Sequence, residues 1–132
     1  MMHCDSKPPE ERPTDEAPAL DEAGAATMGK MQQMTMPVSM TVGEHKYGVH
    51  VVQYMPRKGA MGVTYYGNKC ITVATHSNKS RRQFAAHDFN ETFWHELTHA
   101  ILFEMGSPLY GNEQFVTDFS SRLSKAVESA RF

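Results

Sequence analysis

The sequence has few cysteines, no long apolar run and no excess of charge of either sign. Its two cysteines, Cys4 and Cys70, lie far apart, so no disulfide framework is expected. No stretch approaches the roughly 20 apolar residues that span a bilayer, and the polar run from Asp5 to Glu16 contains no signal-peptide core. The net charge of -2 gives no global field to attract nucleic acid. These absences predict a soluble cytoplasmic protein without membrane partners.

The charge is distributed unevenly along the chain. Residues 1–26 hold seven acids and several prolines but almost no large apolar side chain, a composition that cannot bury enough surface to offset the entropy of ordering. A methionine-rich stretch follows, which favours adaptable packing over a copper site because no Cys or His accompanies it. We therefore expect a disordered acidic, Pro- and Met-rich tail over residues 1–36 and one folded domain over residues 37–132.

The first half of that domain has the pattern of β-strands. Residues 38–42 alternate with period two, and a second β-rich run covers residues 47–54 before Pro56. Two further runs, residues 61–66 and 69–74, are separated by Gly67-Asn68, which predicts a hairpin with the glycine at positive φ.

The second half predicts two helices. Asp88 and Glu91 have the spacing of a capping box, and Gly106 with Pro108 closes the first helix near residue 105. The second helix covers residues 112–130, with an apolar stripe expected to face the core, made of Val116, Phe119, Leu123 and Val127. Strands followed by helices predict an α+β fold, with a small antiparallel or mixed sheet packed on the first helix and a C-terminal helix.

The first predicted helix contains the motif His95-Glu96-Leu-Thr-His99. Histidines four residues apart project from one face of a helix, so that two imidazole nitrogens reach one metal ion. Glu96 lies about 100° around the helix, beside that position, where a carboxylate takes a proton from a metal-activated water. The alternative is a pair of core histidines satisfied by hydrogen bonds. The position of the motif inside a predicted helix favours a single Zn²⁺ ion.

A catalytic zinc site needs a third protein ligand. Leu102 and Met105 stand where a metzincin would carry Gly and His, which excludes that class. Glu104 lies about 140° from His99 around the helix and points elsewhere.

Three acids of the second helix are candidates: Glu113, Asp118 and Glu128. Glu113 lies about 60° from the inward-facing Val116, whereas Asp118 lies about 160° away and faces solvent. We therefore predict Glu113 as the third ligand, in preference to a role as a first-turn acid that favours the helix dipole.

Over roughly residues 60–125 the chain resembles the gluzincin zinc metallopeptidases, in particular the small ImmA/IrrE-like and SprT-like enzymes of bacteria and phages. The hairpin, the arginine-bearing segment before the helix, the His95–His99 motif and the helix that begins with Glu113 carry this resemblance. It implies a zincin-like fold, with His95, His99 and Glu113 as zinc ligands and Glu96 as general base. It also implies a protein or peptide substrate, bound as an extended strand along a sheet edge.

Other roles stay open at this stage. Tyr110 is a candidate donor to the developing oxyanion, with Tyr65, His76 and His87 as alternatives and ordinary packing of Tyr110 as an equal interpretation. The alternative function is a non-catalytic zinc-binding regulatory or interaction domain, in which Cys70 closes the fourth position. Nucleic acid is a weaker candidate partner, through the cluster Lys79, Arg81 and Arg82, which is more typical of a solvated loop.

Overall fold

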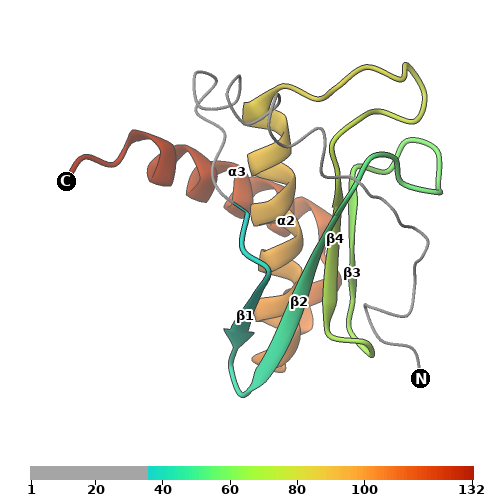
Figure 1. Ribbon diagram of the computed structural model, residues 1–132. Coiled ribbons are helices and arrows are strands. Elements are labelled where there is room, and N and C mark those ends of the chain that lie inside the picture. Colours follow the sequence, from blue (N-terminus) through green and yellow to red (C-terminus); the bar gives the residue numbers. More distant parts are fainter. Residues whose placement is uncertain (1–35) are drawn as a thin grey trace.

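The computed structural model describes residues 36–132. The predicted tail therefore lies outside the described residues, apart from Met36, which packs partly buried against the core. The described chain forms strands and then helices, in the order β1 (Ser39–Val42), β2 (His45–Val52), β3 (Gly62–Tyr65), β4 (Cys70–Ala74), α2 (Ala86–Glu104), the 3₁₀ helix η3 (Pro108–Gly111) and α3 (Glu113–Ser129) (Figure 1). This order confirms the α+β prediction.

The sheet is mixed, with strand order β1-β2-β4-β3. β1 and β2 form an antiparallel pair, β2 and β4 run parallel, and β3 pairs antiparallel with β4 as the predicted hairpin. The hairpin thus puts β3 at one edge of the sheet, beside the helix that carries the His95–His99 motif. This placement decides which strand borders the candidate site.

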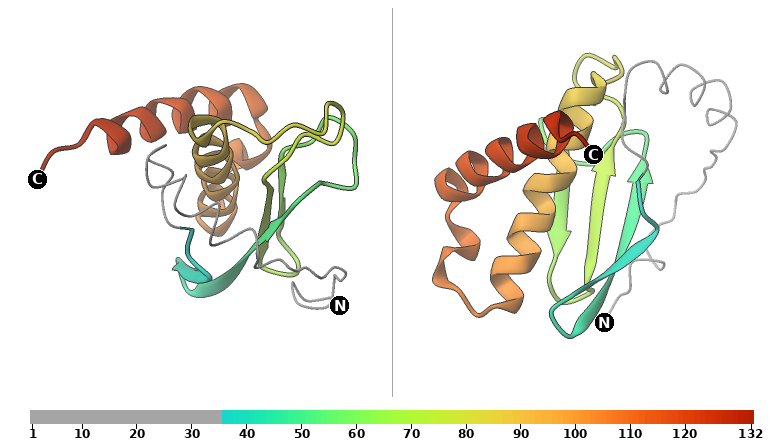
Figure 2. Two further views of the ribbon diagram at one scale, coloured as in Figure 1. Left: turned by 45° about the horizontal axis from the view of Figure 1, so that its top comes forward. Right: turned by 90° about the vertical axis from the view of Figure 1, so that its left-hand side faces the viewer.

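α2 covers one face of the sheet, and α3 crosses α2 on the side away from the strands (Figure 2). The core between α2 and the sheet holds Tyr47, Val49, Ile71, Val73, Phe89 and Phe93 among its buried residues. Ile71 and Val73 share a face of β4 and both belong to this core. Their burial against α2 fixes the register between the helix and the strands.

The C-terminus of α2 follows the prediction, whereas its N-terminus does not. Gly106 adopts a φ of 73°, and the N–H groups of Gly106 and Ser107 donate to the carbonyls of Phe103 and Leu102, a complete Schellman motif. At the other end the helix begins at Ala86, and its N-cap residue, Ala85, provides no side-chain hydrogen bond. The predicted capping box of Asp88 and Glu91 is therefore wrong. Ala86 and Phe89 are buried, so tertiary packing extends the helix past its local start signal.

The predicted inward stripe of α3 is also wrong in part. Val116, Ser120 and Ser124, spaced four residues apart, are the buried residues of this helix, whereas Phe119 and Val127 are 48% and 46% exposed. Because α3 packs mainly on α2, it buries a narrow stripe, and small serine side chains allow the two helices to approach closely. Val116 does face inward, as the prediction for Glu113 assumed when it measured the position of Glu113 around the helix from Val116.

The hairpin turn places its positive φ at Lys69 (55°) rather than at Gly67. The turn covers four residues, 66–69, instead of two, and its last residue adopts the left-handed conformation. Lys69 Nζ then lies 2.7 Å from a carboxylate oxygen of Glu104. The same carboxylate accepts from the Tyr47 hydroxyl at 2.7 Å and lies 2.8 Å from His45 Nδ1. These contacts fasten the end of α2 to β2 and to the hairpin.

Glu104→Gln is expected to lower the free energy of unfolding by about 1–3 kcal/mol near neutral pH, because the buried Tyr47 hydroxyl and the Lys69 ammonium lose a charged acceptor. The Lys69 and Tyr47 hydrogen bonds lower the pKa of Glu104 from 4.5 to about 2. The stabilisation is therefore complete above pH 4.5 and is lost as the pH falls towards 2. Urea unfolding of the wild type and of Glu104→Gln, with chelator present, should give free energies of unfolding whose difference becomes smaller as the pH falls from 4.5 towards 2. A difference independent of pH there would contradict the ion-pair assignment.

None of the helices within residues 36–132 is long and apolar enough to cross a membrane.

Candidate metal centre and cleft

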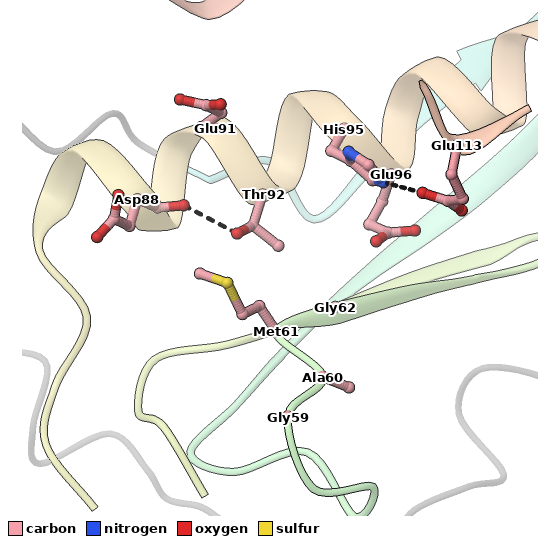
Figure 3. Close-up of a pocket in the computed structure, with 10 residues that line it drawn as sticks. All are labelled: Gly59, Ala60, Met61, Gly62, Asp88, Glu91, Thr92, His95, Glu96 and Glu113. Atoms are coloured by element: carbon pink, nitrogen blue, oxygen red, sulfur yellow. Dashed lines mark hydrogen bonds and ion pairs between the residues drawn. The ribbon is translucent and has the colours of Figure 1, made fainter. Parts of the chain in front are cut away.

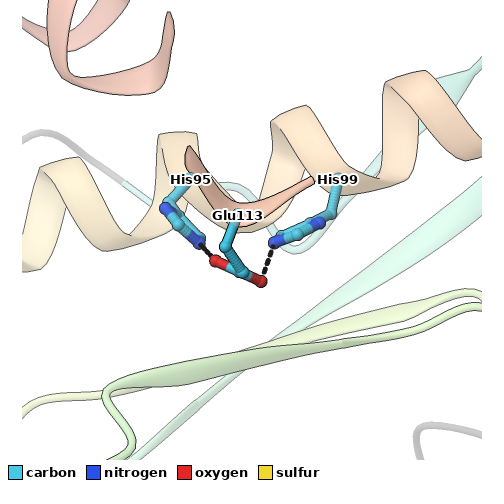
Figure 4. Close-up of side chains that lie close together, drawn as sticks. All are labelled: His95, His99 and Glu113. Atoms are coloured by element: carbon cyan, nitrogen blue, oxygen red, sulfur yellow. Dashed lines mark hydrogen bonds and ion pairs between the residues drawn. The ribbon is translucent and has the colours of Figure 1, made fainter. Parts of the chain in front are cut away.

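His95 and His99 lie one turn apart on the same face of α2 (Figure 4). Their ring centroids are 4.9 Å apart and the ring planes are inclined by 68°. The His99 side chain is 8% exposed and that of His95 is 23% exposed. The helix therefore holds two imidazoles side by side at its surface, as the spacing predicted.

Glu113 is the first residue of α3 and meets both histidines. Its Oε1 lies 3.2 Å from His95 Nε2, and its Oε2 lies 3.0 Å from His99 Nε2. The loop after Gly106 and the η3 turn bring the chain back along α2, and the Asn112 side chain caps α3 by accepting from the Phe115 N–H. The structure thus brings together the three residues that the sequence predicted as ligands.

The other two acids considered on α3 lie elsewhere. Asp118 is exposed and accepts a hydrogen bond from Gln114, and Glu128 lies 3.5 Å from His87. Within residues 36–132, His95, His99 and Glu113 form the one group of three or more metal-binding side chains whose ligand atoms converge, all within 4.8 Å of one another. Cys70 is not part of this group. It is a buried residue of β4 whose Sγ lies 3.9 Å from the Thr72 hydroxyl oxygen, so the idea that its thiolate closes a fourth position is not supported.

The backbone of Tyr110 orients the His99 ring. His99 Nδ1 lies 2.7 Å from the Tyr110 carbonyl oxygen, which only accepts hydrogen bonds, so Nδ1 carries the proton. Nε2 of a neutral His99 then has a lone pair directed at the Glu113 carboxylate. A metal-binding histidine in proteins commonly donates its second N–H to such a carbonyl, which fixes the tautomer.

The donor set fits a divalent cation. A neutral His99 has one proton for two neighbours that both accept, the Tyr110 carbonyl and the Glu113 carboxylate. An imidazolium resolves this mismatch, and so does a metal ion shared by Nε2 and the carboxylate. Two donor atoms about 2.0–2.1 Å from a tetrahedral zinc ion lie about 3.3 Å apart, close to the 3.0 and 3.2 Å observed. Two histidines and one glutamate are a common protein ligand set for catalytic zinc.

Glu96 lies on the neighbouring side of α2, facing the edge strand β3. The residue is 8% exposed. The Thr64 hydroxyl donates to its Oε1 at 2.7 Å and also lies 2.9 Å from its backbone carbonyl oxygen. This contact joins the helix to β3 and fixes the carboxylate beside the three clustered side chains.

Gly62 of β3 permits this close approach of strand and helix. A Cβ at this position would lie 2.8 Å from Thr92 Cγ2, 3.0 Å from the Thr72 carbonyl oxygen and 3.2 Å from Glu96 Cγ. Any larger residue would therefore push β3 away from Glu96. Neither Gly62 nor Thr64 can be recognised from the sequence, because no local pattern links them to Glu96, from which Thr64 is separated by 32 positions.

Burial raises the pKa of Glu96, against the opposing effect of the Thr64 hydrogen bond. A carboxylate with a raised pKa is a stronger base than one exposed to water. The local environment is therefore of the kind that suits proton transfer.

A cleft of about 480 Å³ opens beside this cluster (Figure 3). It is bounded on one side by α2 and on the other by the chain that leads into β3. Its lining includes His95, Glu96 and Glu113 together with Met61 and Gly62. The candidate metal centre is thus at the wall of a cavity large enough to hold part of a peptide.

Two tyrosines and two histidines were candidates for the oxyanion donor, and the Tyr110 ring is packed among aromatic residues, in line with the alternative that the sequence left open. Tyr110 contributes its carbonyl to His99, and its ring packs edge-on against Tyr66 and Phe103. His87 pairs with Glu91, and His76 with Thr75. Tyr65, on β3, is 41% exposed.

Tyr66, which no sequence pattern indicates, lies nearer to the site. Its ring stacks on Phe103 and meets Tyr110 edge-on. Burial and the charges of Glu96, Tyr110 and Glu113 raise the pKa of Tyr66 to about 12. Its phenol is therefore protonated at neutral pH and within electrostatic range of the two carboxylates.

Five basic residues, Arg57, Lys58, Lys79, Arg81 and Arg82, lie on two loops, one between β2 and β3 and the other between β4 and α2. Asn78 joins these loops by donating to the Met55 and Arg57 carbonyls and accepting from the Gly59 N–H. Arg81 lies over the Tyr54 ring at 3.9 Å. The predicted cluster Lys79, Arg81 and Arg82 is therefore joined to the loop that bears Arg57 and Lys58.

No protein-family model, curated protein or solved structure matches this chain. Its function is therefore inferred from its residues and their geometry.

Proposed function

We propose that this protein is a zinc-dependent peptidase that hydrolyses peptide bonds. The observation that carries the proposal is the convergence of His95, His99 and Glu113 on one point, with the buried Glu96 beside it and an open cleft in front. One zinc ion per chain is the metal that this donor set favours.

The residues of the chain have separate roles in this proposal. His95, His99 and Glu113 hold the ion, and Tyr110 holds His99 in the required tautomer through its carbonyl. When bound, zinc lowers the pKa of a water molecule and polarises the scissile carbonyl. Glu96, held by Thr64, takes the proton of the attacking water and passes it to the leaving amine. Tyr66 is the candidate donor to the developing oxyanion, in place of the Tyr110 hydroxyl.

The edge of β3 offers a place for the substrate backbone. The Ala74 N–H donates to the Met61 carbonyl, so in the antiparallel ladder Val63 and Tyr65 pair with β4, whereas the backbone groups of Gly62 and Thr64 face the free edge. An extended peptide can add to such an edge by main-chain hydrogen bonds. It would then pass directly in front of Glu96.

The test combines metal analysis with peptide cleavage. The purified chain is expected to contain about one zinc ion, and to cleave peptides of a complex proteome digest, detected as new N-termini by mass spectrometry. Treatment with a zinc chelator should abolish the new N-termini, and added zinc should restore them.

The alternative function, a non-catalytic zinc-binding regulatory or interaction domain, gives a different result. It predicts the same zinc content with no new N-termini under any condition. The buried Glu96 favours the peptidase, since a site that only stabilises the fold has no need of a base there. Absence of both zinc and cleavage would contradict both functions.

A further inference from the structure

The two walls of the cleft differ in polarity. The wall formed by the chain that enters β3 is uncharged, with Gly59, Ala60, Met61 and Gly62. The wall formed by α2 and the start of α3 contributes four carboxylates, those of Asp88, Glu91, Glu96 and Glu113. No lysine or arginine lines this cleft. A cavity with one apolar and one acidic wall suits a long side chain with an aliphatic stem and a positive end.

Three of these carboxylates are already engaged. Glu96 and Glu113 belong to the proposed chemistry. Glu91 lies 3.1 Å from His87 Nε2, and Figure 3 shows its side chain directed away from the Met61 wall.

Asp88 is the carboxylate that remains. Its backbone carbonyl accepts from the Thr92 hydroxyl at 2.8 Å, but its carboxylate makes no hydrogen bond or ion pair with any residue in the described part of the chain. Met61 extends from the opposite wall towards Asp88 and Thr92 (Figure 3). An aliphatic stem lying along Met61 would thus bring its charged end to Asp88.

The spacing along α2 locates this position relative to the reacting bond. Asp88 precedes His95 by seven residues, which is about 10 Å along a helix. An extended peptide advances about 3.3 Å per residue. Asp88 therefore lies within about three residues of the bond in front of the metal centre.

The direction of β3 decides on which side of that bond the residue falls. β3 runs from Gly62, next to Met61 and the Asp88 end of the cleft, to Tyr65. A peptide that adds antiparallel to β3, the slightly more stable pairing, runs the opposite way. Its C-terminal part then lies at the Asp88 end.

From this arrangement we propose that the cleft selects substrates with a lysine or arginine within three residues after the cleaved bond, through Asp88 and the stem contact with Met61. The inference rests on the proposed peptidase function and adds its substrate class. Its test does not require catalysis, because the preference for lysine or arginine is a property of peptide binding.

The experiment uses the whole chain, zinc-loaded and carrying Glu96→Gln, which is expected to bind peptides without cleaving them. Three fluorescein-labelled alanine peptides with a single lysine, norleucine or glutamate are compared by anisotropy. Lysine is expected to bind roughly tenfold more tightly than glutamate at low salt, with norleucine between them and the difference shrinking as salt rises. Adding Asp88→Asn should reduce the ratio of the lysine and norleucine affinities towards one.

Glu44→Gln in the same background is the matched control, because Glu44 is exposed in the turn between β1 and β2 and does not line the cleft. It should leave the ratio unchanged. Equal binding of the three peptides, or a lysine preference that survives Asp88→Asn, would overturn the inference.

Cleavage profiling of the wild-type protein tests on which side of the cleaved bond the lysine or arginine is bound. Lysine and arginine should be enriched in the first three positions after the cleaved bond, and enrichment before the bond instead would contradict the antiparallel arrangement. A complete lack of cleavage would count against the proposed function alone, since the binding comparison still decides whether the subsite exists.

Discussion

Glu96→Gln is expected to reduce peptide cleavage by at least about a hundredfold while leaving zinc bound, because the variant loses the base but none of the three ligands. Glutamine retains the shape of the side chain, and its amide oxygen can still accept from the Thr64 hydroxyl that now contacts Oε1 at 2.7 Å. The strand–helix contact is thereby kept. The measurement is the rate of cleavage of a peptide identified in the digest, together with zinc content by mass spectrometry.

Glu44→Gln provides the control for this prediction too, since it removes a carboxylate from an exposed turn away from the cleft. It should retain both activity and zinc. Undiminished cleavage by Glu96→Gln would refute the assignment of Glu96 as base. Loss of zinc together with activity would instead assign Glu96 a role in holding the metal.

Glu113→Ala is expected to lower the zinc content to below about a tenth of an ion per chain after dialysis against a competing chelator, with loss of cleavage, because a site of three protein ligands would retain only two. The Glu113 side chain is 69% exposed, so its removal leaves no buried cavity. The far-UV circular dichroism spectrum should therefore keep its helical signal, which separates loss of metal from loss of fold.

The same dialysis applied to His95→Ala should give the same loss of zinc. Asp118→Ala is the matched control, because it removes an exposed acid of the same helix that lies outside the cluster. Its zinc content should equal that of the wild type. If Glu113→Ala retained a full complement of zinc, the third ligand would lie elsewhere and the close contacts of Glu113 with both histidines would reflect ion pairing alone.

Some local signals in which one residue type satisfies one backbone requirement proved reliable, although Gly67 does not take the positive φ predicted for the hairpin turn. Gly106 terminates α2 because the left-handed conformation there suits a residue without a Cβ, and Asn112 begins α3 because its side chain accepts the Phe115 N–H. The period of two along a strand likewise puts Ile71 and Val73 on one face of β4, where both are buried.

Signals that compete with packing were misleading. Asp88 has the sequence context of an N-cap, but burial of Ala86 and Phe89 starts the helix earlier and leaves Asp88 in its first turn. Phe119 is more hydrophobic than Ser120, yet Ser120 is the one buried against α2, since close contact between two helices selects small side chains.

By itself the sequence determined the α+β order of elements, the two histidines on one helical face and the choice of Glu113 over Asp118, because helical periodicity fixes the relative directions of residues a few positions apart. Only the tertiary structure decided which distant groups meet them. The Tyr110 carbonyl at His99, the Thr64 hydroxyl at Glu96 and the space left by Gly62 all depend on how the η3 turn and the β3 edge pack on α2. The cleft and the position of Asp88 within it have the same origin, since a cavity is a property of surfaces that fold together and not of any local pattern.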